Sequence, residues 1–285
     1  MANDGSSTES GYDWKACRYD PSLAVAIVFI ICFAVTTFIH MYQMIRTRTW
    51  YFIPLCIGGF FEMIGYIGRA LSSQESPNWT LGPYIMQTLL LLIAPALFAA
   101  SIYMVLGRII ELVNGEEHAI IKRRWLTKLF VCGDVLSFTL QMAGGGTMAS
   151  GSLGAVKLGE KIVIVGLFIQ IVFFGLFIVV ASIFNFRMHR RPTEKAAERD
   201  GIWHKHLNVL YAVSALIMVR SVFRVVEYIQ GNDGYLLRHE VYLYVFDAVL
   251  MLAVMVVFNF VHPSEVKACL RGGRVAKGLR MYTLE

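Results

Sequence analysis

The chain carries little charge for its length. Asp, Glu, Lys and Arg make up 16% of its 285 residues, whereas 56% of the residues are apolar. A typical soluble domain has about 25% charged and about 45–50% apolar residues. The composition therefore excludes an ordinary soluble protein and indicates that much of the apolar surface faces lipid.

Sequence features that would indicate an enzyme or an ATP-driven pump are also missing. No GxxxxGK[ST] motif occurs, so the chain does not itself couple transport to nucleotide hydrolysis. The seven histidines lie outside the apolar segments or at their ends. They are too far from the acidic residues inside those segments to build a zinc centre or a Ser-His-Asp triad. We therefore expect no enzyme activity, no metal and no cofactor.

The sequence lacks the features of familiar seven-helix receptors and retinal proteins. Its last apolar segment has no lysine to form a retinal Schiff base, and its third ends at Tyr103 and Arg108 without an Asp/Glu-Arg-Tyr pattern. Of its five cysteines only Cys17 is expected outside, which excludes an extracellular disulfide. No internal repeat indicates an inverted-repeat transporter. A receptor of an unusual kind remains an alternative function.

Seven apolar segments, each long enough to cross a bilayer, fill most of the chain. They predict an all-α membrane protein, a seven-transmembrane helix bundle without a soluble domain. We recognise no signal peptide. Residues 1–20 are expected to form a disordered extracellular tail, 21–262 the transmembrane domain and 263–285 a basic cytoplasmic tail. The predicted spans are 21–45, 51–71, 83–106, 126–148, 161–186, 206–229 and 240–261.

The basic residues predict the orientation of the bundle. Most of the 26 Lys and Arg residues fall near alternate breaks between the spans, around 46–50, 107–125, 187–205 and after 261. Because basic loops stay cytoplasmic, the N-terminus is predicted outside and the C-terminus in the cytoplasm. The pI of about 9.1 then reflects topology and contact with anionic lipids at the cytoplasmic face, not nucleic-acid binding.

Polar residues inside the spans are the candidate substrate-binding set. Helical spacing places them in stripes, such as Glu240, Tyr244 and Asp247 in the last span. Glu62 lies about 16 Å from the cytoplasmic start of its span, and Asp247 lies about 10 Å from the outer start of its span. Most of the set falls between mid-bilayer and the outer surface, whereas Asp134 falls in the inner half. The set comprises Glu62, Tyr66, Arg69, Gln87, Asp134, Gln141, Gln170, Arg220, Arg224, Glu227, Tyr244 and Asp247.

Two interpretations of this set stay open. In the structural one, the acids neutralise the arginines and the glutamines join helices by hydrogen bonds. In the functional one, the set lines a cavity that opens toward the outer leaflet and binds the head group of an amphiphile. Glu62, Glu227 and Asp247 would then supply the counter-charge, and Arg69 and Arg224 would hold those acids. Because the acids outnumber the arginines, one acid is either protonated or neutralised by a cationic ligand.

Two local features bear on helix packing. Pro95 is expected to kink the third span, since proline cannot donate the helical hydrogen bond. Gly144, Gly145 and Gly146 end the fourth span, where small residues permit a flexible end and close helix packing.

Several stretches of this polar set form a recognisable pattern across residues 20–265. They include Glu62-Met-Ile-Gly-Tyr-Ile-Gly-Arg69, Asp134-Val-Leu-Ser-Phe-Thr-Leu-Gln141, Arg220-Ser-Val-Phe-Arg224-Val-Val-Glu227 and His262-Pro263. With these motifs the chain resembles the fungal RTA-like family, named for resistance to aminocholesterol and also called the lipid-translocating exporter family.

The resemblance implies a multi-pass membrane transporter of lipids or other amphiphiles, such as a sphingoid base or a sterol-like compound. Such a protein would confer tolerance to toxic lipids and drugs. It would lie in the plasma membrane, with the endoplasmic reticulum or vacuole as alternatives. Two other functions stay open: a heptahelical sensor that regulates lipid handling, and a porphyrin or haem transporter. A homodimer is among the assemblies that the sequence leaves open.

The predicted topology places Asn78 in an outside loop, within the glycosylation pattern Asn78-Trp79-Thr80. We expect the protein from cells to lose mass on endoglycosidase treatment, and Asn78→Gln to abolish this shift. Tags inserted in the 72–82 loop should be reachable from outside intact cells. A cytoplasmic position for that loop would overturn the topology.

Overall fold

The structure, a computed structural model, describes residues 22–75, 81–148, 152–230, 234–271, 274–275 and 282–283. Seven of its helical segments are long and apolar enough to cross a membrane. The predicted all-α, seven-span fold is therefore confirmed. The expected tail at 1–20, Cys17 and Asn78 lie outside the described residues, as does part of the expected tail at 263–285.

Helices make up nearly all of the described chain. Two short strands form one antiparallel pair near the C-terminus, with Arg274 opposite Thr283. The elements are α1 (Leu23–Thr47), η1 (Trp50–Phe52), α2 (Ile53–Gln74), α3 (Leu81–Leu112), η2 (Glu116–His118), α4 (Arg123–Met148), α5 (Leu153–Arg190), α6 (Glu194–Glu198), α7 (Asp200–Gln230), α8 (Tyr235–Arg238), α9 (Glu240–Leu243), η3 (Tyr244–Val249), α10 (Leu250–Phe260), α11 (Ser264–Arg271), β1 (Arg274–Val275) and β2 (Tyr282–Thr283).

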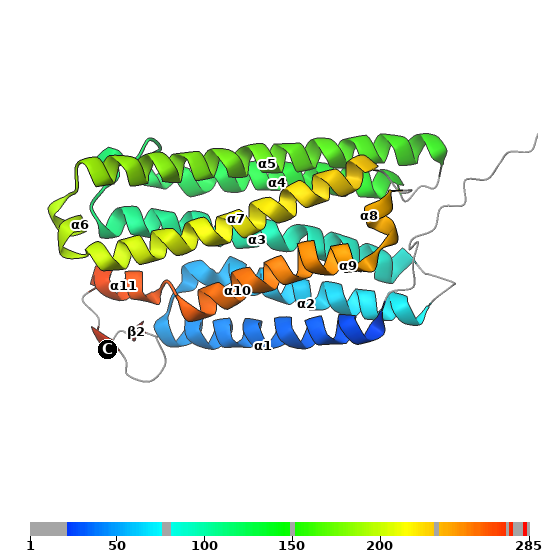
Figure 1. The fold of residues 1–285 in the computed structure, drawn as a ribbon, viewed down its shortest axis with the longest axis horizontal. Coiled ribbons are helices and arrows are strands. Elements are labelled where there is room, and N and C mark those ends of the chain that lie inside the picture. The colour runs from blue at the N-terminus through cyan, green and yellow to red at the C-terminus, as the bar shows by residue number, and fades with distance from the viewer. Residues whose placement is uncertain are drawn as a thin grey trace, which may run out of the picture.

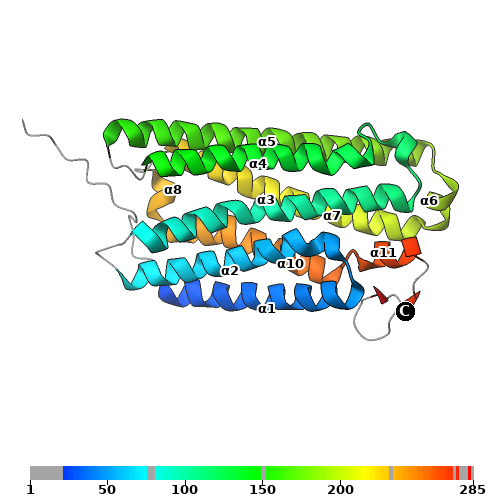
Figure 2. The ribbon, with the colours of Figure 1, turned by 180° about the vertical axis from the view of Figure 1, so that it is seen from behind.

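The long helices run side by side in an elongated bundle (Figure 1). α4 packs along α5, α2 packs between α1 and α3, and α7 contacts α3, α5 and α10. α6 and α11 lie at one end of the bundle, and α8 and α9 at the other (Figures 1 and 2). α3 and α7 therefore occupy the middle, and their buried faces are where polar side chains from several spans can meet.

Basic residues gather at the end of the bundle that carries α6 and α11. α1 ends there with Arg46 in its last turn, and α5 ends there with Arg187 and Arg190. Arg123 at the start of α4 pairs with Glu111 near the end of α3. We call this the basic end. The positive-inside rule predicts that it is cytoplasmic.

Three spans differ in detail from the predicted segments. α5 begins at Leu153 rather than near 161, because the Ser152 hydroxyl accepts a hydrogen bond from the Ala155 amide and caps the helix. Its 38 residues extend over about 57 Å, well beyond the roughly 30 Å hydrocarbon core. α3 continues on both sides of Pro95. The last span contains a π-helical segment, η3, which includes Asp247.

Glycines let α4 and α5 approach each other closely. A Cβ atom at Gly144 would lie 2.7 Å from the Gly159 carbonyl oxygen and 2.9 Å from the Val163 amide nitrogen. These are backbone atoms and cannot move aside. A Cβ at Gly145 or Gly146 would meet nothing within 4 Å. The expected close packing is therefore made by Gly144 alone of the three.

This contact predicts opposite effects for neighbouring substitutions. Gly144→Ala should lower the free energy of unfolding by about 1–3 kcal/mol, because it forces α4 and α5 apart. Gly145→Ala, the matched control, should leave it unchanged or raise it by roughly 0.5–1 kcal/mol through helix propensity. Thermal melting of both purified variants in detergent measures the difference. Equal melting temperatures would contradict the packing argument.

Candidate functional site: a buried charge cluster

Arg220 on α7 joins three spans through one guanidinium group. Its Nε donates to Oδ1 of Asp247 in η3, and its Nη2 donates to the Leu91 carbonyl oxygen of α3 at 2.7 Å. Both charged side chains are 1% exposed. The hydrocarbon core of a bilayer offers no water to hydrogen-bond these charged groups, so the protein must supply their partners.

Pro95 explains why the Leu91 carbonyl is available to Arg220. In an α-helix each carbonyl accepts from the amide four residues later, which for Leu91 is position 95. Proline has no amide hydrogen, so this carbonyl has no helical partner. Arg220 supplies the missing donor. The expected disturbance of α3 at Pro95 is thus satisfied by a side chain from another span.

A second arginine on α7 pairs within its own helix. Nη1 of Arg224 lies 2.7 Å from Oε2 of Glu227, three residues later, and both side chains are buried. The guanidinium also lies 5.6 Å from the ring centroid of Tyr228. This pair agrees with the structural interpretation, in which Glu227 neutralises an arginine.

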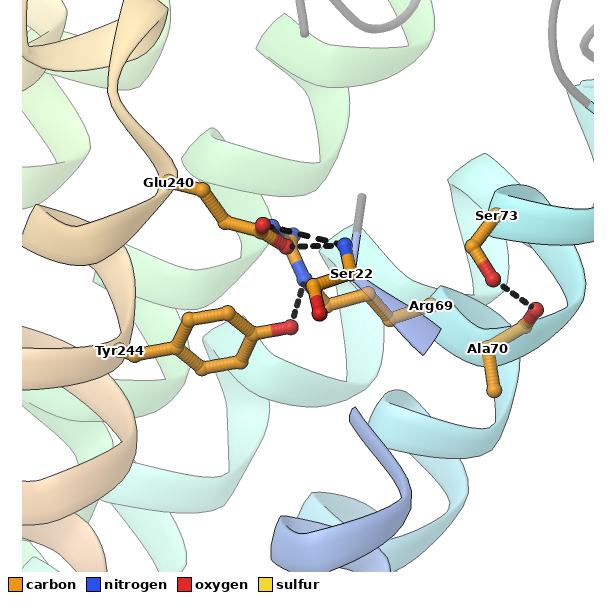
Figure 3. Close-up of polar contacts among 6 residues, drawn as sticks. All are labelled: Ser22, Arg69, Ala70, Ser73, Glu240 and Tyr244. Carbon is orange, nitrogen blue, oxygen red and sulfur yellow. Dashed lines mark hydrogen bonds and ion pairs between the residues drawn. The ribbon is translucent and has the colours of Figure 1, made fainter. Parts of the chain in front are cut away.

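Arg69 forms a third group, between α2 and the start of the last span (Figure 3). Its Nη2 lies 2.8 Å from Oε1 of Glu240, and its Nε donates to the Tyr244 hydroxyl at 2.9 Å. The Ser22 amide donates to both Glu240 oxygens at 2.9 and 3.0 Å. The sequence predicts that Arg69 holds Glu62 or Asp247. In the structure Arg69 pairs with Glu240 instead. Glu240 lies four residues before Tyr244 and therefore on the same helical face.

Aromatic rings pack directly beneath Arg69. Phe29 of α1 stacks between Tyr244, with ring centroids 5.3 Å apart, and Tyr66, at 5.5 Å. Phe33 stacks on Tyr66 at 5.5 Å. The guanidinium of Arg69 lies 4.9 Å from the Tyr244 centroid, within cation–π distance. The rings hold α1 against α2 and η3.

Glu62 is the acid that remains without a direct partner. It is fully buried on α2, and neither carboxylate oxygen forms a hydrogen bond within the described structure. Its charged neighbours are Asp247, Arg220 and Arg224. The Tyr66 hydroxyl and Oδ2 of Asp247, also buried, likewise have no hydrogen-bond partner among the described residues. These side chains interact electrostatically, so several acceptor oxygens share one buried region.

The rest of the predicted set lies elsewhere. Gln141 of α4 donates to the Ser137 hydroxyl at 2.7 Å and to Gln170 of α5 at 3.2 Å, and Ser137 donates to the Gly166 carbonyl. This chain of bonds ties α4 to α5, as the structural interpretation holds.

Asp134 and Gln87 complete the predicted set. Asp134 is a further buried acid beside Tyr103, in a region separate from Glu62. Gln87 on α3 is buried with its Oε1 unbonded within the described structure. Among the described residues, no three His, Cys, Asp or Glu side chains are placed to hold a metal ion.

Comparison with known proteins identifies the family of this chain. The family model described as RTA1 like protein matches residues 55–268. The chain belongs to the RTA1-like family. These residues include most of the buried charge cluster, although Ser22 and the α1 aromatic residues lie before them. No solved structure matches.

Three relatives from Saccharomyces cerevisiae show the range of names within the family. Protein RTM1 is 37% identical, over 90% of this chain and 93% of its own length. Protoporphyrin uptake protein 1 is 38% identical, over 89% of this chain and 93% of its own length. Sphingoid long-chain base transporter RSB1 is 25% identical, over 86% of this chain and 72% of its own. Two of these names describe uptake or transport, and none of the three names an enzyme.

The Arg220 contacts predict a large stability loss on truncation. Arg220→Met should lower the free energy of unfolding by about 3–5 kcal/mol, because it leaves a buried carboxylate and a carbonyl without donors. Adding Asp247→Leu should restore part of the loss by removing the unpaired charge. Melting in detergent and the yield of folded protein give the measurement. As a control, Arg124→Met on the exposed start of α4 should change stability by less than about 0.5 kcal/mol. Equal losses for Arg220→Met and the control would exclude the proposed contacts.

Proposed function

We propose that the protein binds single-chain or steroid-like amphiphiles with a positively charged head group, such as sphingoid bases, and moves them across the membrane. Glu62 is the acid that accepts the head group in this proposal. The protein would thereby confer tolerance to toxic lipids, and its place would be the plasma membrane, with the endoplasmic reticulum or vacuole as alternatives. The proposal is supported by the relative named as a sphingoid base transporter.

The observation that carries this proposal is the excess of acceptors around Glu62. Both Glu62 oxygens, the Tyr66 hydroxyl oxygen and one Asp247 oxygen are buried without hydrogen-bond donors in the described structure. A primary ammonium group has three donors and no acceptor. It therefore complements this region in both donors and charge, whereas an anionic group without donors would leave the acceptors unsatisfied.

Charge balance favours the same ligand. The central group contains the acids Glu62, Glu227 and Asp247 and the bases Arg220 and Arg224. When all are ionised, three acids and two arginines leave one negative charge. A single ammonium head would balance it, and so would one proton on Glu62. Exchange of a proton for the ammonium would couple transport to a proton gradient, which suits a chain without a nucleotide-binding motif.

A porphyrin is the second candidate, because a relative 38% identical to this chain is named a protoporphyrin uptake protein. Porphyrin carboxylates would need arginine partners. Arg69, Arg220 and Arg224 each already pair with an acid, so such a cargo would have to displace one. The acceptor-rich region thus favours the cationic amphiphile.

A sensor that acts on lipid handling indirectly is the rival to a transporter. Purified protein in liposomes separates the two, since a transporter should move a fluorescent sphingoid base between leaflets without any partner protein. A sensor would bind the base without moving it. A new visible absorbance band after incubation with protoporphyrin, without sphingoid base transfer, would favour the second candidate.

Glu62→Gln tests the central residue directly. The substitution keeps the shape of the side chain but removes its charge, so sphingoid base transfer should fall by at least about tenfold through loss of a charged hydrogen bond. Stability should stay equal or rise, because no arginine pairs with Glu62 and a buried unpaired acid is removed.

Two further variants control for burial and for pairing. Asp134→Asn removes another buried acid, which lies beside Tyr103 and away from Glu62, and should leave transfer unchanged. Glu227→Gln leaves Arg224 with a weaker partner and should lower the melting temperature. Full transfer by Glu62→Gln would exclude Glu62 as the head-group acid. A melting loss matching that of Glu227→Gln would instead assign Glu62 a structural role.

A further inference from the structure

A pocket of about 440 Å³ lies between α5 and α7, and its lining is Ser182, Asn185, Phe186, His189 and Tyr211. The volume falls in the range of small-molecule sites, roughly 300–1,000 Å³. It belongs to the last turns of α5, at the basic end of the bundle. No residue of the buried charge cluster on α2, α7 and η3 lines this pocket, so its function must be explained separately.

The pocket lies at the end of an exposed apolar strip on α5. Ser182 is about 12 Å along the axis from the end of α5 at Arg190. Toward the middle of the bundle the same face of α5 exposes Val172, Leu176 and Val179, each about half exposed. These positions continue into Ser182 and Phe186 at helical spacing. An exposed apolar strip thus leads directly into a polar pocket.

Positive charge and aromatic rings border the pocket. The Arg190 guanidinium lies 4.3 Å from the centroid of Phe186, and it forms no ion pair with any residue that the structure describes. The His189 ring lies 4.7 Å from that of His204, which packs at 3.6 Å on Trp203. Arginine near the end of a span is typical of the lipid head-group region, whereas Trp203 is buried and supports the two histidine rings from within the bundle.

The polar atoms inside the pocket are not fully satisfied by the protein. Asn185 Oδ1 and the Tyr211 hydroxyl oxygen are buried atoms without a hydrogen bond of good geometry in the described structure. The Ser182 hydroxyl donates to the Ile178 carbonyl, and Nδ1 of His189 bonds the Asn185 carbonyl. The Tyr211 hydroxyl oxygen lies near the side chains of Ser182 and Asn185, so its proton and Nε2 of His189 are what remains to face a ligand.

We infer that this pocket binds the phosphate head group of an anionic phospholipid from the leaflet at the basic end. Arg190 and the Tyr211 hydroxyl supply donors to the phosphate, and an acyl chain lies along Val172, Leu176 and Val179. The apolar strip favours a lipid over free phosphate, because only a lipid would cover it. The site is independent of transport through Glu62.

The test measures retained lipid on the purified full-length protein. After delipidation, the protein in detergent is titrated with phosphatidylserine, phosphatidylcholine or inorganic phosphate, and bound lipid is counted by native mass spectrometry. Phosphatidylserine should bind at least about tenfold more tightly than phosphatidylcholine, as expected for a charge-assisted phosphate contact left uncancelled by a choline group. Inorganic phosphate should not compete at millimolar concentration.

Variants locate the site. Arg190→Gln should weaken phosphatidylserine binding by about tenfold, and Ser182→Leu should abolish it by filling the pocket. Both positions are exposed, so the melting temperature of the lipid-free protein should not change. Arg124→Gln, at the same end of the bundle, is the charge control and should bind as the unmodified protein does.

Three results would overturn the inference. Equal binding of both lipids would exclude recognition of an anionic head group. An equal loss in Arg190→Gln and Arg124→Gln would indicate general attraction to the basic end. Displacement of phosphatidylserine by millimolar phosphate would assign the pocket to a soluble anion. If Ser182→Leu lowers the melting temperature, the lipid binding of Arg190→Gln alone decides between these outcomes.

Discussion

The guanidinium of Arg220 is the contact on which the centre of the bundle depends. It binds the carbonyl that Pro95 leaves without a helical donor and the carboxylate of Asp247. A proline in α3, an arginine in α7 and a π-helical segment in the last span are thus one arrangement. Water cannot complete such bonds at this depth, so each of the three features requires the others. A π-helical turn inside an α-helical span is itself often a mark of a functional site.

The pairing of the buried arginines with acids determines which charged groups remain available to a ligand. Arg220, Arg224 and Arg69 hold Asp247, Glu227 and Glu240 respectively. The rings of Phe29, Tyr66 and Tyr244 pack beside the Arg69 pair. Glu62 lies near Asp247, Arg220 and Arg224 without a hydrogen-bond partner in the described structure. The structural interpretation accounts for the paired residues, and the proposed function draws on the acid that they leave, Glu62.

Sequence alone predicted the spans well, because length and hydropathy respond to the bilayer directly. It also predicted that Glu62, Tyr66 and Arg69 share a face, since helical spacing decides that. It did not predict the pairing of Arg69 with Glu240, which depends on how the helices are rotated against each other. The π-helical segment at Asp247 and the early start of α5 were missed too. Asp247 in the first bonds Arg220 of α7, a contact between distant parts of the chain, and the second follows the Ser152 cap.

A transport site must bind its cargo and also release it, and the neighbours of Glu62 bear on both. An isolated buried carboxylate would hold an ammonium strongly, since attraction grows as the dielectric falls. Here the positive charges of Arg220 and Arg224 repel an ammonium group at Glu62, whereas the negative charge of Asp247 attracts it. The opposing charges reduce the net attraction without supplying the hydrogen bonds that Glu62 lacks. Selection of the head group would then rest on donor geometry, and release would be helped by the arginines that stabilise the empty site.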